Sequence, residues 1–279
     1  TGNVWYVDSG AGTDSAAYGK NPDTPFATLD YAIGKCTASN GDIIFVMPGH
    51  AESIVGASTL TLDIAGVKII GLGSGLTIPT FTYTTDATAT FNITAANCHV
   101  ENLYLYSNFE DGITAGITVG ALADGLVLKN IIMEEGANTT EFLVGISVTA
   151  ACHHVTIDGL KFYGVAGGTD SSCIVLAGAS NFSIIKNCEI YGDFSGAVID
   201  ATGAASTFLT LKDNILHNVD TGAGLTFSAH SSTTGICANL AAFGNLDAAT
   251  PVGAAMAFFQ SLVTNAAGAQ GIYKPAQDS

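Results

Sequence analysis

The segment His99-Val-Glu-Asn102-Leu-Tyr-Leu105 decides the fold, because an asparagine stands in it with apolar residues alternating on both sides. The pattern returns at steps of 25 to 31 residues, and Gly71 marks a fainter first copy. A period of roughly 20–50 residues indicates one structural unit stacked on copies of itself. Asn and Gly adopt a left-handed backbone most readily, so each marks a sharp bend between two short strands. The predicted structural ladder is Asn102, Asn130, Gly159, Asn187, Asn214 and Asn239.

Apolar residues stand at fixed positions relative to these bends. The residue directly after the bend is apolar in every copy: Leu72, Leu103, Ile131, Leu160, Cys188, Ile215 and Leu240. The residue two places before the bend is also apolar, except at Lys212, where the neighbouring Leu211 indicates a one-residue bulge before Asn214. Alternation with period two on both sides predicts two strands per turn, each with one buried face.

A third short strand precedes each bend by some 10 to 13 residues. The segments are 90–94, 116–120, 145–149, 173–177, 197–201 and 224–228. Three short strands per turn, separated by loops of variable length, predict an all-β fold, a parallel β-helix of roughly 7–9 turns.

The residue just before the bend alternates in charge along the chain. The column reads Glu101, Lys129, Asp158, Lys186 and Asp213. Strands stacked in register lie about 4.8 Å apart, so each of these charges is expected between two opposite ones. The column is therefore interpreted as a register device rather than as a charged binding strip, because exposed ion pairs contribute only about 0–1 kcal/mol each.

The two ends of the β-helix need caps, because each end exposes strand edges and apolar core. We expect residues 1–41 to form a strand and a short capping helix. In that helix Thr24 suits the N-cap, Pro25 the first helical position, and Phe26, Leu29 and Ile33 an apolar stripe over the core. The β-helix is expected over residues 42–245.

Residues 246–279 are predicted to form a C-terminal helical cap or association helix, followed by a tail. The Ala-rich stretch after Thr250-Pro251 carries apolar residues at Met256, Phe259, Leu262 and Val263 that would share one side of a helix.

The composition excludes several classes of function. Acidic residues outnumber basic ones by 24 to 8, giving a net charge of −16, and the chain contains no arginine. Without a basic patch we expect no binding to nucleic acid or to anionic membranes. No apolar run reaches the roughly 18 residues that a membrane crossing requires. The six cysteines show no C-x-x-C spacing and are interpreted as free thiols that fill the core.

The opening segment carries a family resemblance. Tyr6-Val-Asp-Ser-Gly, Asn21-Pro-Asp-Thr-Pro-Phe-Ala-Thr-Leu and Gly41-Asp-Ile-Ile-Phe-Val-Met-Pro-Gly-His50, followed by the asparagine ladder, resemble the right-handed parallel β-helix proteins of the pectate-lyase-like superfamily. The N-terminal part is similar to β-helix proteins of bacteriophage particles and to some secreted bacterial surface proteins. The resemblance covers roughly residues 3–245 and implies an extracellular or virion-surface location. Members of the superfamily include lyases, hydrolases, tailspikes, adhesins and structural proteins.

No catalytic residue is predicted. The resemblance implies that an enzyme of this superfamily would carry its catalytic and calcium-binding groups on the outer face of the third strand. That face carries Gly, Thr, Ser, Asn, Cys, Val and Ala, with Asp200 as the one titratable exception. Acid–base catalysis requires paired titratable groups. The arginine base of pectate-lyase-like enzymes is also missing.

Two features remain as candidate binding surfaces. Outward positions four residues after the bend include Tyr106, Tyr163, Tyr191 and Phe243, which suggest a platform for glycans or a partner protein, or else a stabilising aromatic ladder. Acidic residues recur in the loops that follow: Glu110-Asp111, Glu134-Glu135, Asp170, Asp193 and Asp220. A solvated acidic ridge is favoured over a calcium site, and neither a metal site nor a cofactor is predicted.

Three hypotheses follow from the sequence. The first is a non-enzymatic structural or surface protein, a decoration or fibre-like protein of a bacteriophage virion, which forms a homo-oligomer (a trimer) or associates with other virion or surface proteins. The second is a polysaccharide-degrading tailspike-like enzyme that uses Asp200 with Glu134–Glu135. The third is a glycan-binding protein that uses the tyrosine column.

Overall fold

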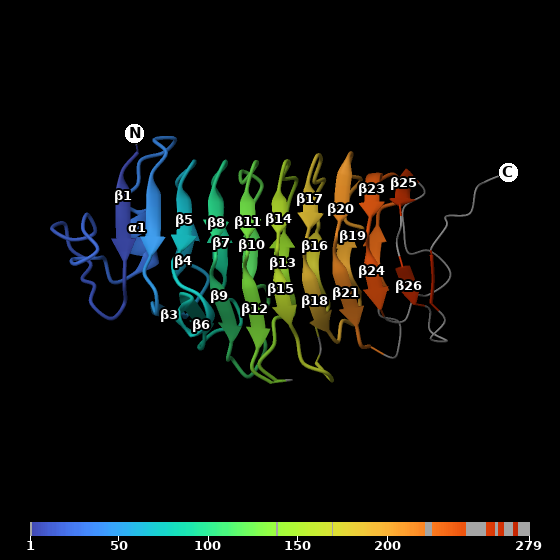
Figure 1. The fold of residues 1–279 in the computed structure, drawn as a ribbon, viewed down its shortest axis with the longest axis horizontal. Coiled ribbons are helices and arrows are strands. Elements are labelled where there is room, and N and C mark those ends of the chain that lie inside the picture. The colour runs from blue at the N-terminus through green and yellow to red at the C-terminus, as the bar shows by residue number, and fades with distance from the viewer. Residues whose placement is uncertain are drawn as a thin grey trace.

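The computed structural model describes residues 2–137, 139–168, 170–220 and 225–243, together with the backbone of residues 255–259, 262–264 and 270–272. The chain winds as a coil of short strands that stack from the N-terminal end to the C-terminal end (Figure 1). Among the described residues, neither the short α1 (Leu29–Ile33) nor the 3₁₀ turn η1 (Gly75–Thr77) has the length needed to cross a membrane.

The strands form three sheets, named here in the order in which each turn visits them. Sheet 1 contains β1 (Val4–Val7), β2 (Ile43–Val46), β5 (Lys68–Gly71), β8 (His99–Glu101), β11 (Val127–Lys129), β14 (Thr156–Asp158), β17 (Ile184–Lys186), β20 (Leu209–Lys212), β23 (Thr234–Ala238) and β25 (Ala255–Phe259). Sheet 2 contains β3 (Ala51–Ile54), β6 (Thr80–Tyr83), β9 (Tyr104–Ser107), β12 (Ile132–Glu135), β15 (Lys161–Tyr163), β18 (Glu189–Gly192), β21 (Ile215–Asn218), β24 (Ala241–Phe243), β26 (Leu262–Thr264) and β27 (Gln270–Ile272). Sheet 3 contains β4 (Leu60–Leu62), β7 (Phe91–Ile93), β10 (Ile117–Val119), β13 (Val144–Val148), β16 (Ser172–Leu176), β19 (Ala197–Ala201) and β22 (Leu225–Ala229).

Strands of successive turns pair in parallel, and among the described strands β26 and β27 alone are antiparallel. The predicted all-β parallel β-helix with three strands per turn is therefore confirmed. The seven strands of sheet 3 correspond to about seven complete turns.

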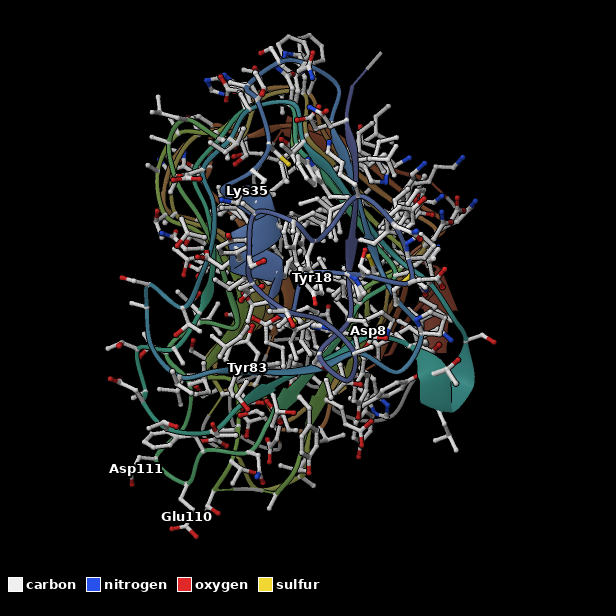
Figure 2. The ribbon with its side chains drawn as sticks, turned by 90° about the vertical axis from the view of Figure 1, so that its left-hand side faces the viewer. Asp8, Tyr18, Lys35, Tyr83, Glu110 and Asp111 are labelled. Carbon is white, nitrogen blue, oxygen red and sulfur yellow. The ribbon has the colours of Figure 1, made fainter. Side chains whose placement is uncertain are left out.

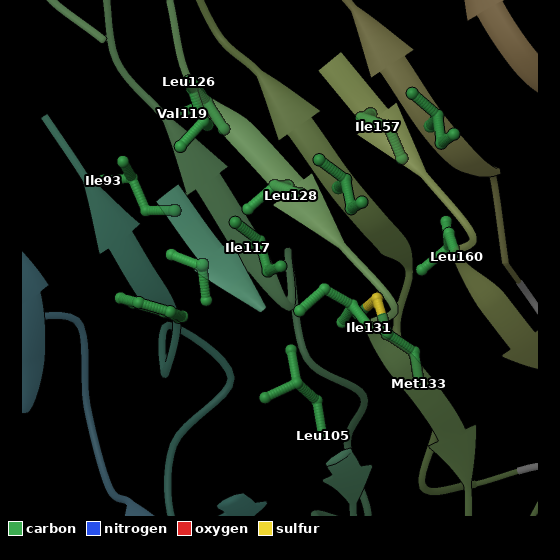
Figure 3. Close-up of a cluster of buried hydrophobic side chains, with 14 of the residues drawn as sticks. Ile93, Leu105, Ile117, Val119, Leu126, Leu128, Ile131, Met133, Ile157 and Leu160 are labelled. Carbon is green, nitrogen blue, oxygen red and sulfur yellow. The ribbon is translucent and has the colours of Figure 1, made fainter. Parts of the chain in front are cut away.

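The core is a continuous column of apolar side chains along the axis of the β-helix. Leu128 of sheet 1, Met133 of sheet 2 and Val119 of sheet 3 are all buried, and they point from their three sheets toward a common centre (Figure 3). Burial of each such side chain contributes about 1.5–3 kcal/mol. The apolar columns predicted from the alternating sequence pattern are thus the inward-facing side chains of the three sheets around this core.

Each bend between sheet 1 and sheet 2, called here the first corner, places one residue in a left-handed conformation. Asn102, Asn130, Gly159 and Asn187 have φ angles of 61°, 51°, 73° and 55°. Their backbone N–H groups donate to the carbonyl oxygen of the residue before the bend in the next turn, at 2.8–3.1 Å. The Asn102 side chain also donates to the carbonyl oxygens of Gly71, at 2.8 Å, and Gly73, at 3.2 Å.

Asn214 departs from the predicted ladder by one residue. The left-handed residue of that turn is Asp213, with φ 56°, and Asn214 is buried in the column otherwise filled by Leu, Ile and Cys. Its side chain accepts from the Cys188 N–H at 3.0 Å and donates to the Ile185 carbonyl oxygen at 2.9 Å. Because the bend comes one residue early, Ile215 faces outward instead of inward.

The alternating charges stack as predicted only in part. Glu101 accepts from Lys129 at 2.8 Å, and Asp158 pairs with Lys186 at 3.2 Å. The prediction is wrong for Asp213, the fifth residue of the column. The early bend moves Asp213 out of the column, so that Lys212 lies in register with Lys186. Lys212 instead lies 3.5 Å from Asp213.

The N-terminal cap lies over the open end of the core, with α1 crossing the end of the column (Figure 2). Phe26, Leu29 and Ile33 are buried, but the helix begins later than predicted. Its N-cap is Thr28, not Thr24. The Asp14 carboxylate holds the segment before the helix in place by accepting from the N–H groups of Ala27, at 2.8 Å, and of Thr28, at 3.1 Å.

The predicted C-terminal helix is wrong over its described part. Residues 255–259 form β25 beside β23, and residues 262–264 form β26 beside β24. The open edge of the preceding turn offers a full row of unpaired backbone groups, and pairing with it outweighs the helix propensity of an Ala-rich stretch. Residues 246–254, 260–261, 265–269 and 273–279 of the predicted cap and tail lie outside the described residues.

Candidate functional site

The outer face of sheet 3, where the resemblance would place a catalytic site, carries small uncharged side chains. Thr118, Ser147, Val175 and Asp200 lie in register on successive strands. The Asp200 carboxylate accepts from the N–H and the hydroxyl of Thr202 at 2.9 and 2.6 Å, so it serves the local turn. On the described strands of this sheet, no second titratable group stands beside Asp200 to form an acid–base pair.

Cys173 does not belong to this outer face. Its side chain is fully buried and belongs to the hydrophobic core cluster. All six cysteines are free thiols, and five of them are buried.

The outer face of sheet 2 carries the predicted tyrosine column. Backbone pairing places Tyr106 beside Glu134, Glu134 beside Tyr163, and Tyr163 beside Tyr191 on successive strands. The side chains of Tyr163 and Tyr191 are each 38% exposed. This column is the most exposed aromatic surface on any of the three sheets among the described side chains.

Further polar and aromatic groups extend this face, which we call the tyrosine face. The Tyr104 hydroxyl donates to the Glu134 carboxylate at 2.8 Å, and the Tyr104 ring stacks on that of Tyr106 at 6.3 Å. His217 takes the next position after Tyr191, and the two rings meet edge to face at 5.1 Å. Asn218 would take this position if the bend fell at Asn214, but the early bend at Asp213 shifts the column by one residue, and Asn218 is buried.

The side chain of Phe243, the last predicted member of the surface, lies outside the described residues. Its backbone pairs with that of His217 in register.

A buried group of three carboxylic acids lies in the loops between sheet 2 and sheet 3. Glu135, Glu141 and Asp170 are 4%, 4% and 0% exposed. Glu135 holds the loops of two turns together, because its carboxylate accepts from the N–H groups of Phe142, at 2.9 Å, and of Val165, at 3.1 Å. The sequence indicated acidic residues here but not their burial.

Asp170 is the unusual member of this carboxyl cluster. Among the described residues, its two oxygens meet no N–H or O–H donor, and its hydrogen-bonding neighbours are the carboxyl groups of Glu135 and Glu141. Burial raises the pKa of Asp170, and the charges of Glu135 and Glu141 raise it further. Burial also raises the pKa of Glu135, although its two backbone donors oppose the shift. The raised pKa of Asp170 keeps a proton on its carboxyl group at neutral pH.

The acidic loops do not form one ridge. Glu110 and Asp111 project away from the molecule (Figure 2), whereas Glu135 and Asp170 are buried. The described part of the chain contains no group of three His, Cys, Asp or Glu side chains arranged to hold a metal ion.

A second ladder of left-handed residues, missed in the sequence, joins sheet 3 to sheet 1 at what we call the second corner. Its members are Ser39, Gly66, Asn97, Gly125, His154, Phe182 and Phe208, with φ between 55° and 75°. Phenylalanine and histidine carry no sequence signal for a left-handed bend, unlike asparagine and glycine. The backbone forces the conformation, since each N–H from Asn97 to Phe182 donates to a carbonyl oxygen of the next turn at 2.7–2.9 Å.

Three aromatic rings stack at the second corner. His154 lies 5.2 Å from Phe182, and Phe182 lies 5.1 Å from Phe208, with interplanar angles of 9° and 18°. A bulky residue in the left-handed region lowers the stability of the fold by about 1–2 kcal/mol, and a stacked ring pair raises it by about 0.5–1.5 kcal/mol. Phe182 and Phe208 are nevertheless 49% and 63% exposed. Folding stability alone therefore does not favour phenylalanine over asparagine at these positions.

No family model and no curated protein sequence matches the chain. Solved structures do resemble it. The pectin methylesterase of Erwinia chrysanthemi has a TM-score of 0.51 at 13% identity, over 99% of this chain and 86% of that one. The chain has a pectate-lyase-like parallel β-helix fold. A rhamnogalacturonan lyase shares the β-helix with a TM-score of 0.51 at 12% identity, over 95% of this chain and 74% of that one.

The GH136 lacto-N-biosidase of Eubacterium ramulus is a third similar β-helix protein, with a TM-score of 0.52 at 14% identity. The match covers 94% of this chain and 55% of that one. At identities this low, structural similarity shows the fold alone. The function of this chain has to be argued from its own side chains.

Proposed function

We propose that this β-helix is a non-enzymatic surface protein that binds extended glycan chains along its tyrosine face. The observation that carries the proposal is the outward-facing column of Tyr106, Glu134, Tyr163 and Tyr191 on a parallel sheet, in which Tyr163 and Tyr191 are exposed. An aromatic ring offers a rigid apolar face to the C–H groups of a sugar. Carboxylate and phenol groups beside it supply hydrogen bonds to sugar hydroxyls.

Binding is favoured over catalysis because the acids considered as catalytic groups do not share one open site. Asp200 lies on sheet 3, whereas Glu134 and Glu135 lie on sheet 2 and point to opposite faces of it. The carboxyl cluster is buried and cannot touch a glycan. A polysaccharide-degrading enzyme would need two such groups at one open site.

The location belongs to the same proposal. We place the protein on the surface of a bacteriophage particle, as a decoration or fibre-like protein, or outside a bacterial cell. The similarity of the Tyr6–His50 segment to β-helix proteins of phage particles and secreted surface proteins supports this location. Antibodies against the purified chain should label particles or cell surfaces, and labelling confined to the cell interior would contradict it.

A glycan array followed by calorimetry with the bound glycan tests the function. The double variant Tyr163→Ala, Tyr191→Ala removes two ring faces, which are worth about 1–3 kcal/mol together, so its Kd should rise about 5- to 150-fold. The matched control, Tyr163→Phe with Tyr191→Phe, keeps the rings and should retain most of the affinity.

Any of three results would overturn the proposal. The first is a wild-type protein that binds no glycan on the array, and the second is a double alanine variant with an unchanged Kd. The third is shortening of the bound glycan by the wild-type protein, which would identify an enzyme.

A further inference from the structure

The second corner gathers exposed apolar side chains. Leu122, Phe182 and Phe208 belong to it and are 76%, 49% and 63% exposed. Ile236 lies beside it on the outer face of sheet 1 and is 45% exposed. Four of the ten large apolar side chains that are exposed among the described residues therefore lie together at one edge of the β-helix.

From β10 and β11 to the C-terminal turns, the surface on both sides of this corner is poor in charge. On sheet 1 the outward column next to the corner is Val127, Thr156, Ile184, Thr210 and Ile236. On sheet 3 the outward column is Thr118, Ser147, Val175, Asp200 and Ser228. The acids on this surface are Asp200, which binds Thr202, and Asp124, which accepts from the His153 N–H at 2.6 Å.

We propose that the second corner and the uncharged columns beside it form the interface between copies of this chain. Each copy carries a net charge of −16, so two copies repel one another except where their surfaces lack acids. Protein interfaces have cores poor in charge and rich in aromatic side chains. A basic partner would instead be drawn to the acidic loops, so the second copy is the occupant that fits this corner.

The backbone of the corner shows that its phenylalanines are not needed for folding. Gly125 and Asn97 hold the same left-handed position two and three turns before Phe182, and they make the same backbone hydrogen bonds. Asparagine and glycine adopt this conformation with little strain, whereas phenylalanine does not. Phe182 and Phe208 combine a strained backbone conformation with exposed rings. This combination indicates that the rings serve a function other than folding of the single chain.

Light scattering after size-exclusion chromatography, at several protein concentrations, measures the association of the full chain. The wild type should form an oligomer, which higher salt should strengthen by screening the repulsion between copies. The double variant Phe182→Asn, Phe208→Asn should weaken association at least about 30-fold, as loss of central aromatic contacts does. Its melting temperature, measured on the dissociated chain, should equal or exceed that of the wild type.

The control is Leu76→Asn, which removes a fully exposed apolar side chain far from the corner. It should leave the molecular mass of the oligomer, measured by light scattering, unchanged. A wild type that remains monomeric at the highest concentration reached would overturn the proposal. So would a double variant that associates as well as the wild type. A double variant with a lowered melting temperature would assign the rings a structural role and overturn it as well.

Discussion

Replacement of Asp170 by asparagine should remove a pH dependence from the stability of this protein. The folded chain keeps a proton on Asp170 because the carboxyl group is fully buried between Glu135 and Glu141. The unfolded chain releases that proton near the ordinary aspartate pKa of about 4. Above that pH the folded state binds more protons than the unfolded state, so the free energy of unfolding falls as pH rises.

The size of the effect follows from one proton. A difference of one bound proton changes the free energy of unfolding by about 1.4 kcal/mol per pH unit, or about 3 kcal/mol between about pH 5 and about pH 7. The full stability is present below the unfolded pKa and declines until Asp170 ionises in the folded state. An asparagine keeps the shape of the side chain and offers N–H donors to the two glutamates. Asp170→Asn should therefore exceed the wild type by about 2–3 kcal/mol near neutral pH.

Urea denaturation followed by circular dichroism at a series of pH values gives the two stability curves. Hydrogen exchange of the Phe142 and Val165 amides, which both donate to Glu135, reports on the loops themselves. The control is Asp200→Asn, since the Asp200 carboxylate accepts hydrogen bonds from Thr202, two residues along the chain, and lies outside the carboxyl cluster. The free energy of unfolding of Asp200→Asn should change with pH as steeply as that of the wild type. Parallel curves for the wild type and Asp170→Asn would refute the reasoning.

Three further predictions concern the corners and the cap, each measured by urea denaturation. Asn102→Ala should lower the free energy of unfolding by about 2 kcal/mol, because it adds backbone strain and removes two hydrogen bonds, while Asn102→Gly should cost less; equal effects would contradict the strain argument. Gly71→Ala should cost about 3 kcal/mol or more, since a Cβ would lie 1.9 Å from the Asn102 carbonyl oxygen, and a well-folded variant would show that the corner can yield. Thr28→Ala should cost about 1 kcal/mol through loss of the N-cap, whereas Thr24→Ala should be nearly neutral; the reverse order would move the helix start.

The architecture was predictable because two local signals repeat in phase. Alternation with period two gives the buried face of each strand, and a residue suited to the left-handed region fixes where each turn bends. Asn102, Asn130, Gly159 and Asn187 all carry both signals, and all four bends lie where they were predicted.

The departures arise where another interaction competes with the local signal. At Asp213, a buried hydrogen-bonded Asn214 replaces an apolar residue and shifts the bend by one. At the C-terminal end, a strand edge left by the preceding turn competes with helix propensity. The carboxyl cluster brings together Glu135 and Asp170 from successive turns. Because the loops between the strands vary in length, this contact could not be predicted from the sequence.

The slip at Asp213 also bears on how such a chain tolerates change. Outward and inward positions are exchanged from Asn214 to Asn218, yet Leu240, directly after the next bend at Asn239, is buried again. Every bend thus sets the phase of its own turn afresh, and a displacement of one residue ends within the turn where it begins. Insertions and deletions are therefore absorbed locally, so a chain of this kind can gain or lose residues in any single turn while the next one keeps its place.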